Sequence, residues 1–196
     1  MKKKKILIAG SILLGIFLLA GVGSHVHKKY TLQKEQEVQL QERIEKENTE
    51  KMDKASANKI PSIIISNAQA KQGERVTLMV SIVNNPGILG MTLNLAFDET
   101  ALKLVDVKEG KAFEGILDMN HSKTLENGCV FLWDGEDLKE DQIQDGEILK
   151  LEFEVLKDAP EGKTQVVLTK DEDGTVDRNL EVVNPVIENG FITITK

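Results

Sequence analysis

The sequence predicts an all-β sandwich over residues 60–196. Apolar and polar residues alternate along residues 88–97, as they do in a strand with one buried and one open face. Turn residues such as Gln72-Gly73, Asn127-Gly128 and Asn189-Gly190 recur at short intervals. No long helical pattern interrupts this region, whose length of roughly 137 residues suits one domain.

Nine short strands are expected, separated by those turns. They lie at residues 63–65, 74–83, 88–97, 102–107, 117–121, 129–133, 147–156, 164–169 and 191–195. The strand at 88–97 follows the tight turn Asn84-Asn85-Pro86-Gly87. Asn127-Gly128 is a strong hairpin signal between the fifth and sixth strands. Cys129 is the only cysteine, so it cannot form an internal disulfide and is expected to be a small buried residue.

The N-terminal residues are organised differently. Four lysines precede a mostly apolar, uncharged run that starts at Ile6. We predict a cytoplasmic tail at residues 1–5 and a transmembrane signal-anchor at 6–27, with the rest of the chain outside the cell. Cleavage near Gly21, Gly23 and Ser24 is the alternative, and it would make the protein a secreted one.

Residues 28–59 are predicted to be a polar stalk between the membrane and the sandwich. They are rich in Glu, Gln and Lys and contain neither Gly nor Pro, which indicates a helix or an extended spacer. Leu32, Val38, Leu40 and Ile44 do not sustain a heptad, so a coiled coil has little support. A helix of this length would extend about 45 Å.

The charge of the sandwich restricts its partners. Residues 60–196 hold 25 acidic and 13 basic side chains, a net charge of −12, whereas the whole chain carries −7. This excess argues against binding to nucleic acid or to an anionic membrane surface. It suits a basic partner, or it serves only to keep the domain soluble.

The residues needed for catalysis or metal binding are sparse, so we predict no enzyme activity, no cofactor and no metal. His121 is the only histidine of the domain, and on a strand it would point away from the face of Ser122. Asp171-Glu172-Asp173-Gly174 resembles part of a calcium loop. Thr169 and Leu180 stand where that loop needs its first and last carboxylates, so the match fails.

Several segments, taken in order, resemble the cohesin modules of bacterial cellulosome-type assemblies. These segments are Val83–Ile88, Leu95–Leu104, Asp145–Leu149, Leu156–Gly162 and Asn189–Ile194. The resemblance covers residues 61–196 and implies a nine-stranded jelly roll. It further implies a dockerin as the partner, a small helical module that carries its own calcium and is borne by secreted enzymes.

The resemblance also implies the binding face, on strands matching residues 88–98, 117–123 and 129–134. With Phe131 and Trp133 in the core, Val130 and Leu132 would point outward. The implied partner-binding residues are Thr92, Asn94, Asn120, Val130, Leu132, Glu136 and Asp137. The polar residues around Leu132 would fix register, and the two rim acids would attract basic dockerin side chains. In the alternative, a neighbouring loop simply covers Val130 and Leu132.

The expected function is therefore that of a monomeric, single-pass membrane protein whose one cohesin-like module holds a dockerin-bearing secreted protein at the cell surface. Such a partner would be a polysaccharide-degrading enzyme or a scaffold. The alternative is a carbohydrate-binding module on the same type of sandwich. That alternative requires an exposed aromatic platform, and Trp133 is the only tryptophan available.

Overall fold

The computed structural model describes residues 24–196, which divide at Glu37 into two units, the described residues 24–36 and residues 37–196. The predicted tail, and all but the last four residues of the predicted membrane span at 6–27, lie outside the described residues. Within the described part of the chain, no helix is both long and apolar enough to cross a membrane. Helix α1, Ser24–Asn58, begins in the first unit and ends in the second, so residues 28–58 of the predicted stalk are helical.

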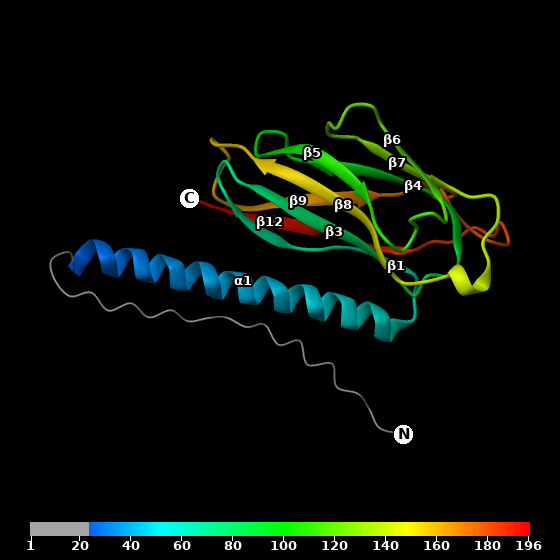
Figure 1. The fold of residues 1–196 in the computed structure, drawn as a ribbon, viewed down its shortest axis with the longest axis horizontal. Helices are drawn as coiled ribbons and strands as arrows, with labels where there is room; N and C mark the ends of the chain where they lie inside the picture. Colours follow the sequence, from blue (N-terminus) through cyan, green and yellow to red (C-terminus); the bar gives the residue numbers. More distant parts are fainter. Residues whose placement is uncertain (1–23) are drawn as a thin grey trace, which may run out of the picture. The chain divides into compact units, whose positions relative to one another are not determined.

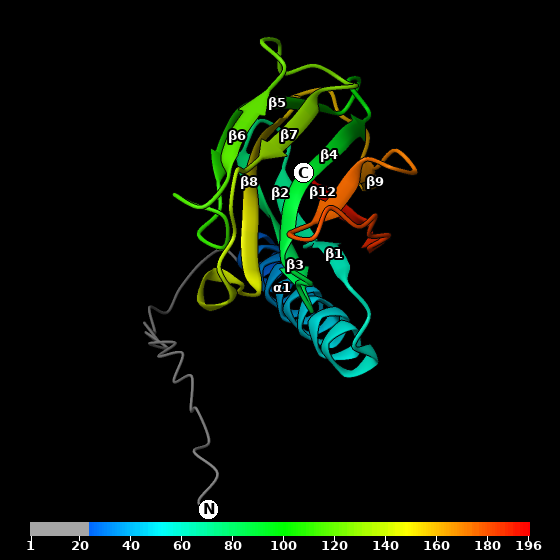
Figure 2. The same ribbon diagram turned by 90° about the vertical axis from the view of Figure 1, so that its right-hand side faces the viewer.

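The second unit is a β-sandwich, as predicted (Figures 1 and 2). Its elements are β1 (Ser62–Ile65), β2 (Ala68–Lys71), β3 (Arg75–Val83), β4 (Ile88–Phe97), β5 (Leu102–Glu109), β6 (Asp118–His121), β7 (Val130–Asp134), the 3-10 turn η1 (Glu140–Gln142), β8 (Gly146–Val155), β9 (Gly162–Thr169), β10 (Thr175–Asp177), β11 (Val186–Glu188) and β12 (Gly190–Thr195). One sheet has the order β11-β1-β3-β8-β5. The other has the order β2-β12-β9-β4-β7-β6, and β10 also pairs with β4.

The structure contains all nine expected strands and adds β2, β10 and β11, so the expected total of nine was wrong for the described residues. Each added strand has only three or four residues, too few for alternation to be visible in the sequence. Both β2 and β11 pair in parallel with strands distant in sequence, β12 and β1. Long-range partners, rather than local propensity, therefore create these two strands.

The core lies between the two sheets and is filled by the inward residues of the alternating strands. Phe131, Trp133 and Phe153 are fully buried. Edge-to-face ring pairs link Phe97 to Phe153, with centroids 5.2 Å apart, and Phe113 to Trp133 at 6.0 Å. Cys129 is buried as predicted, and burial raises the pKa of its thiol.

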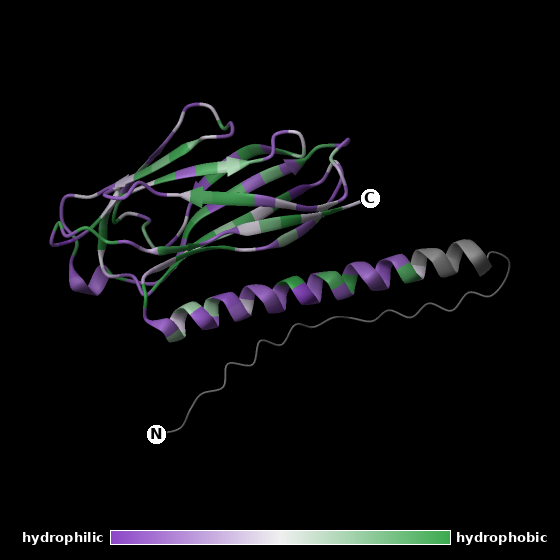
Figure 3. Cartoon of the chain, turned by 180° about the vertical axis from the view of Figure 1, so that it is seen from behind, coloured by the Kyte–Doolittle hydropathy of each residue, from purple (hydrophilic) through white to green (hydrophobic). Residues whose placement is uncertain are grey.

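Helix residues 37–58 belong to the same compact unit as the sandwich and pack on it. Ala55 and Met52 cover Ile64 of β1 and Val83 of β3, whose side chains point away from the main core. Figure 3 shows how hydrophilic the helix otherwise is. Besides Ala55 and Met52, Ile44 is the other buried apolar side chain of this part of the helix, at 2% exposed, and polar contacts reinforce the packing.

Several polar contacts fasten this part of the helix, among them a hydrogen bond of 2.8 Å from the Asn84 side-chain amide to the Ala55 carbonyl. The Asn48 side chain donates to the carbonyl of Asn67 at 2.9 Å and accepts from its backbone N–H at 2.7 Å. The Lys51 ammonium donates to three acceptors: the Ile65 carbonyl, the Asn67 amide oxygen and the Asn189 carbonyl. Desolvation at this half-buried position lowers the pKa of Lys51. An ion pair of 2.8 Å between Glu37 and Lys71 adds a further contact.

Candidate partner-binding face

The turn at Asn84-Asn85-Pro86-Gly87 sets the start of β4. The Asp145 carboxylate accepts the backbone N–H groups of Asn84 and Asn85, at 3.0 and 2.8 Å, and so ties the turn to the beginning of β8. The Asn85 side chain in turn accepts the N–H groups of Gly87 and Ile88. Gly87 has φ +91°, a conformation that favours glycine. These bonds fix which side chains of β4 point outward.

The strand register arranges the outward side chains in rows across β4, β7 and β6. One row joins Thr92, Leu132 and Asn120, and Val130 lies opposite Asn94 in the next. Opposite residues of antiparallel strands share a face of the sheet. Five of the seven predicted site residues therefore lie together on one face.

Leu132 is the exposed apolar residue at the centre of this face. Its neighbours Phe131 and Trp133 are fully buried, whereas Leu132 is 43% exposed. Val130 is half-buried. Because β7 is flanked by β4 and β6, Leu132 is not at a sheet edge, and its exposure means that no loop covers it. The outward orientation predicted for Leu132 is confirmed, and its covering by a loop is not observed.

The polar residues around Leu132 have free hydrogen-bonding groups. Within residues 24–196, the side chains of Thr92, Asn94 and Asn120 form no hydrogen bond with another residue. Amide and hydroxyl groups held on rigid strands beside an exposed leucine can pair with a partner at little cost in ordering.

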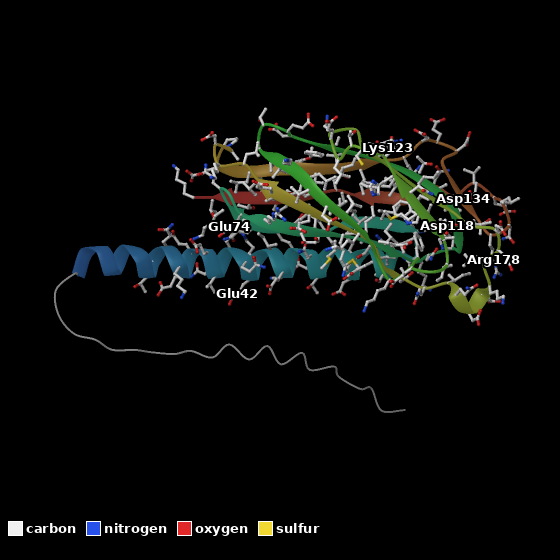
Figure 4. All side chains as sticks on the ribbon, turned by 45° about the horizontal axis from the view of Figure 1, so that its top comes forward. Glu42, Glu74, Asp118, Lys123, Asp134 and Arg178 are labelled. Atoms are coloured by element: carbon white, nitrogen blue, oxygen red, sulfur yellow. The ribbon has the colours of Figure 1, made fainter. Side chains whose placement is uncertain are left out.

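The acidic rim differs from the sequence-based prediction in one respect. Glu136 and Asp137 are exposed, but they lie in the loop after β7 and outside the rows of the sheet. Asp134 and Asp118 occupy the row next to Leu132, opposite Gly90, and Figure 4 shows the two acids side by side. The alternation that places Leu132 outward also places Asp134 outward, so this signal was present in the sequence. Among the described residues, none of the four carboxylates forms an ion pair.

The groups that could carry catalysis are engaged in structure. The Nδ1 atom of His121 lies 2.7 Å from the Ser122 carbonyl oxygen, and Ser122 Oγ accepts the N–H of Val130. No group of three or more His, Cys, Asp and Glu side chains within the described range could hold a metal ion. Trp133 is fully buried against Phe113 and offers no surface on which a sugar ring could stack.

A β-sandwich with an open, amide-rich face around one exposed leucine has the form of a protein-interaction module. The cohesin domain model matches residues 61–194, and the chain therefore belongs to the cohesin domain family. Cohesin domains are non-catalytic modules of protein–protein interaction. No curated protein sequence matches the chain significantly.

Solved cohesin structures share the fold at low sequence identity. The OlpC cohesin of Clostridium thermocellum, solved in complex with a dockerin, is 24% identical with a TM-score of 0.58, and the match covers 70% of this chain and 94% of that one. The seventh ScaB type I cohesin of Pseudobacteroides cellulosolvens is 21% identical (TM-score 0.57; 69% and 92% covered). A non-cellulosomal cohesin of the archaeon Archaeoglobus fulgidus is 19% identical (TM-score 0.56; 70% and 92% covered).

Proposed function

We propose that this protein captures a dockerin-bearing secreted protein on the face formed by β4, β7 and β6. The observation that carries the proposal is Leu132, 43% exposed in the middle of a sheet and surrounded by polar side chains without partners. An apolar centre with a polar surround is the usual anatomy of a protein interface. The partner would bury Leu132 and pair with Thr92, Asn94 and Asn120.

The charges on the face specify the partner further. Asp118 and Asp134 lie beside Leu132, and Glu136 and Asp137 extend the negative potential beyond the strand ends. A partner with lysine or arginine next to its apolar contact would associate faster and in one orientation. Calcium has a place in this proposal only inside the dockerin.

Known complexes support a dockerin as this partner. The OlpC and OlpA cohesins of Clostridium thermocellum have both been solved with dockerins bound. The Archaeoglobus fulgidus protein is described as non-cellulosomal, so a cohesin fold alone does not place a protein in a multi-enzyme assembly. We therefore propose the capture of a polysaccharide-degrading enzyme or scaffold, without assigning a particular complex.

The location of this capture is also part of the proposal. Residues 6–27 would span the cell membrane once, with residues 1–5 inside, and the sandwich would hold its partner outside the cell. A cohesin module behind this anchor would act as a monomeric surface receptor. If the segment were cleaved, the same face would act in a secreted protein.

Calcium-dependent capture tests the proposal. The full chain, solubilised in detergent micelles and immobilised, is mixed with the secreted proteins of the source organism, with calcium or with chelator. Recovery of a protein with paired twelve-residue calcium loops, lost on chelation, is the expected result. Retention on insoluble polysaccharide without any calcium-dependent protein partner would instead support the carbohydrate-binding alternative.

A further inference from the structure

A lysine and a buried asparagine meet where helix α1 contacts the sandwich. Lys51 Nζ lies 3.1 Å from the Oδ1 atom of Asn67, a residue of the short connection between β1 and β2. Asn67 is only 4% exposed, and Lys51 is half-buried. The partner-binding face does not include this pair. An amine beside a carboxamide is a nucleophile beside an acyl group, so the two side chains have the groups that an amide cross-link requires.

The asparagine is held in a fixed position. Asn48, on the same face of the helix as Lys51, donates to the Asn67 carbonyl at 2.9 Å and accepts its backbone N–H at 2.7 Å. The backbone N–H of Phe191 donates to Asn67 Oδ1 at 3.3 Å. Within residues 24–196, no acceptor holds the amide nitrogen Nδ2 of Asn67. The carboxamide therefore has a hydrogen-bonded oxygen and a leaving nitrogen that no other residue holds.

The lysine is oriented toward this carboxamide by two further bonds. Its ammonium also donates to the carbonyls of Ile65 and Asn189, at 3.3 and 2.8 Å. When the ammonium loses the proton that points at Asn67, these two carbonyls keep the remaining N–H groups, and the lone pair takes the direction of Asn67. Groups positioned in this way react far faster than the same groups free in solution.

The surroundings of Lys51 favour the neutral amine and supply an acid. Desolvation lowers the pKa of Lys51, and the charges of Glu188 and Glu47 oppose this effect. The charge of Lys163 lowers the pKa as well. Both glutamates line the same cleft of about 310 Å³ as Lys51 and Asn67, where a carboxylate can carry a proton from the amine to the leaving nitrogen. Because the reaction runs once and releases ammonia, a small neutral fraction of Lys51 is enough.

We propose that Lys51 and Asn67 form an intramolecular isopeptide bond that ties helix α1 to the sandwich. Nζ of Lys51 attacks Cγ of Asn67, and the Phe191 N–H stabilises the charge that develops on Oδ1. The Nζ–Cγ amide bond forms and the Cγ–Nδ2 bond breaks. Glu188 takes a proton from the attacking amine and passes it to Nδ2, which leaves as ammonia. Overall, an ammonium and a carboxamide become a secondary amide and an ammonium ion, with no oxidation or reduction.

The bond would make the helix a permanent part of the module. Hydrogen bonds and a few apolar side chains allow a helix to leave the sandwich and return, whereas an amide bond keeps it in place when either end of the chain is pulled. The inference is independent of dockerin capture, because every group that it uses belongs to this chain.

Peptide mapping of the full chain, purified in detergent micelles and incubated at neutral pH, tests the bond. Trypsin does not cleave after an acylated lysine, but it still cleaves after lysines 46, 54 and 59. The cross-link therefore gives one branched peptide, residues 47–54 joined to residues 60–71, with the summed mass of the two less one ammonia. Trypsin removes the residues between them, so only a cross-link keeps the two together.

Conservative variants provide the controls. Lys51→Arg keeps the charge and the donors, but its guanidinium stays protonated and cannot attack Asn67, so the branched peptide should be lost completely. Lys54→Arg, at a residue that lines the same cleft, should retain it. Glu188→Gln should slow its appearance at least about tenfold. Circular dichroism checks that each variant is folded.

Recovery of the branched peptide from the wild type and from Lys54→Arg, but not from Lys51→Arg, establishes the bond. Recovery of only the separate peptides, with Lys51 cleaved normally and Asn67 intact, overturns it. Conversion of Asn67 to aspartate without a branched peptide also overturns it, because water would then be the nucleophile. An unchanged rate in Glu188→Gln would overturn the role of Glu188 in proton transfer.

Discussion

The outer faces of the two sheets both carry apolar and charged side chains, but the chain covers and pairs them to different extents. On the β11-β1-β3-β8-β5 sheet, helix residues cover the apolar Ile64 and Val83. The charges on this sheet pair with one another: Arg75 with Glu152 at 3.2 Å, Lys150 with Glu147 at 3.2 Å and Lys108 with Asp106 at 3.1 Å. Although Met79 and Val186 on this sheet are exposed, these residues of the helix and these ion pairs cover or pair much of the face within the chain itself.

On the face of β10, β4, β7 and β6, apolar side chains are exposed and carboxylates lack ion-pair partners among the described residues. Leu132 and Val182 are exposed, and Asp118 and Asp134 form no ion pair with any residue from 24 to 196. Exposed apolar residues gathered on one surface usually mark an interaction site. Both faces are built from the same kind of alternating strands. A candidate interaction face can therefore be recognised within one molecule, by comparing which outward side chains are covered or paired and which are not.

The largest expected effect comes from placing a charge on each face. Leu132→Asp should weaken binding of the calcium-dependent partner about a hundredfold, because it puts a desolvated carboxylate at the centre of the interface. Met79→Asp, at a residue 36% exposed on β3, should leave affinity unchanged. Isothermal titration measures both, and circular dichroism checks that both variants are folded. Equal losses for the two variants would remove the distinction between the faces.

A charge placed between the helix and the sandwich should lower stability and leave partner affinity unchanged. Ala55 is buried against the sandwich and Ala57, in the same final turns of α1, is exposed. Ala55→Arg should lower the free energy of unfolding by about 2 kcal/mol, since the larger charged side chain cannot fit. Ala57→Arg should cost almost nothing. Urea denaturation measures both, and partner affinity should survive in each folded variant.

Neutralising the acids should affect the rate of binding more than its strength. The double variant Asp118→Asn with Asp134→Asn should slow association about fivefold at low ionic strength. The difference should nearly vanish in 1 M salt, where charges are screened. Glu152→Gln with Glu154→Gln removes the same charge from the other sheet and should leave the rate unchanged. Stopped-flow association at two salt concentrations provides the test.

The smallest effect concerns Glu109 at the end of β5. Burial raises the pKa of Glu109, and nearby Glu114 and Asp118 raise it further. Its Oε1 atom is buried without a hydrogen-bond partner. Because the pKa is higher in the folded state, the protonated form favours folding, and this contribution is lost as pH rises through the folded-state pKa.

Glu109→Gln should therefore give a small gain in stability at pH 7 and none at pH 3.5. Urea denaturation at the two pH values measures the gain, with the exposed Glu126→Gln as the control. A gain that is the same at both pH values would mean that the amide packs better, and that ionisation of Glu109 costs nothing.

Alternation made much of the face predictable. Leu132 could be placed outward because Phe131 and Trp133 on either side of it are large and apolar. Strand β10 could not be found in this way, because three residues show no period and the Val176–Val182 bridge depends on a turn organised by Asp177. The seven predicted residues stay a prediction as contacts with a partner.

The packing of the helix was also hidden from the sequence. Ile44 and Ala55 of the helix are both buried, at 2% exposed each, and Met52 packs beside Ala55. The polar residues Asn48 and Lys51 also contact the sandwich and lie between these apolar positions, so the buried side of the helix does not stand out as an apolar stripe in the sequence. The boundary between residues 59 and 60 stays a prediction. The compact unit that contains the sandwich begins earlier, at Glu37.

The bond from the Lys51 ammonium to the Asn189 carbonyl, 2.8 Å long, joins residues 138 positions apart. During synthesis Lys51 emerges first, and its acceptor just before β12 is made 138 residues later. The bond can therefore form only when almost the whole domain is available, and contacts of such long separation form late in folding. A nascent chain that stops short of β12 would carry a loose helix and an open edge, which quality-control proteases could recognise as incomplete.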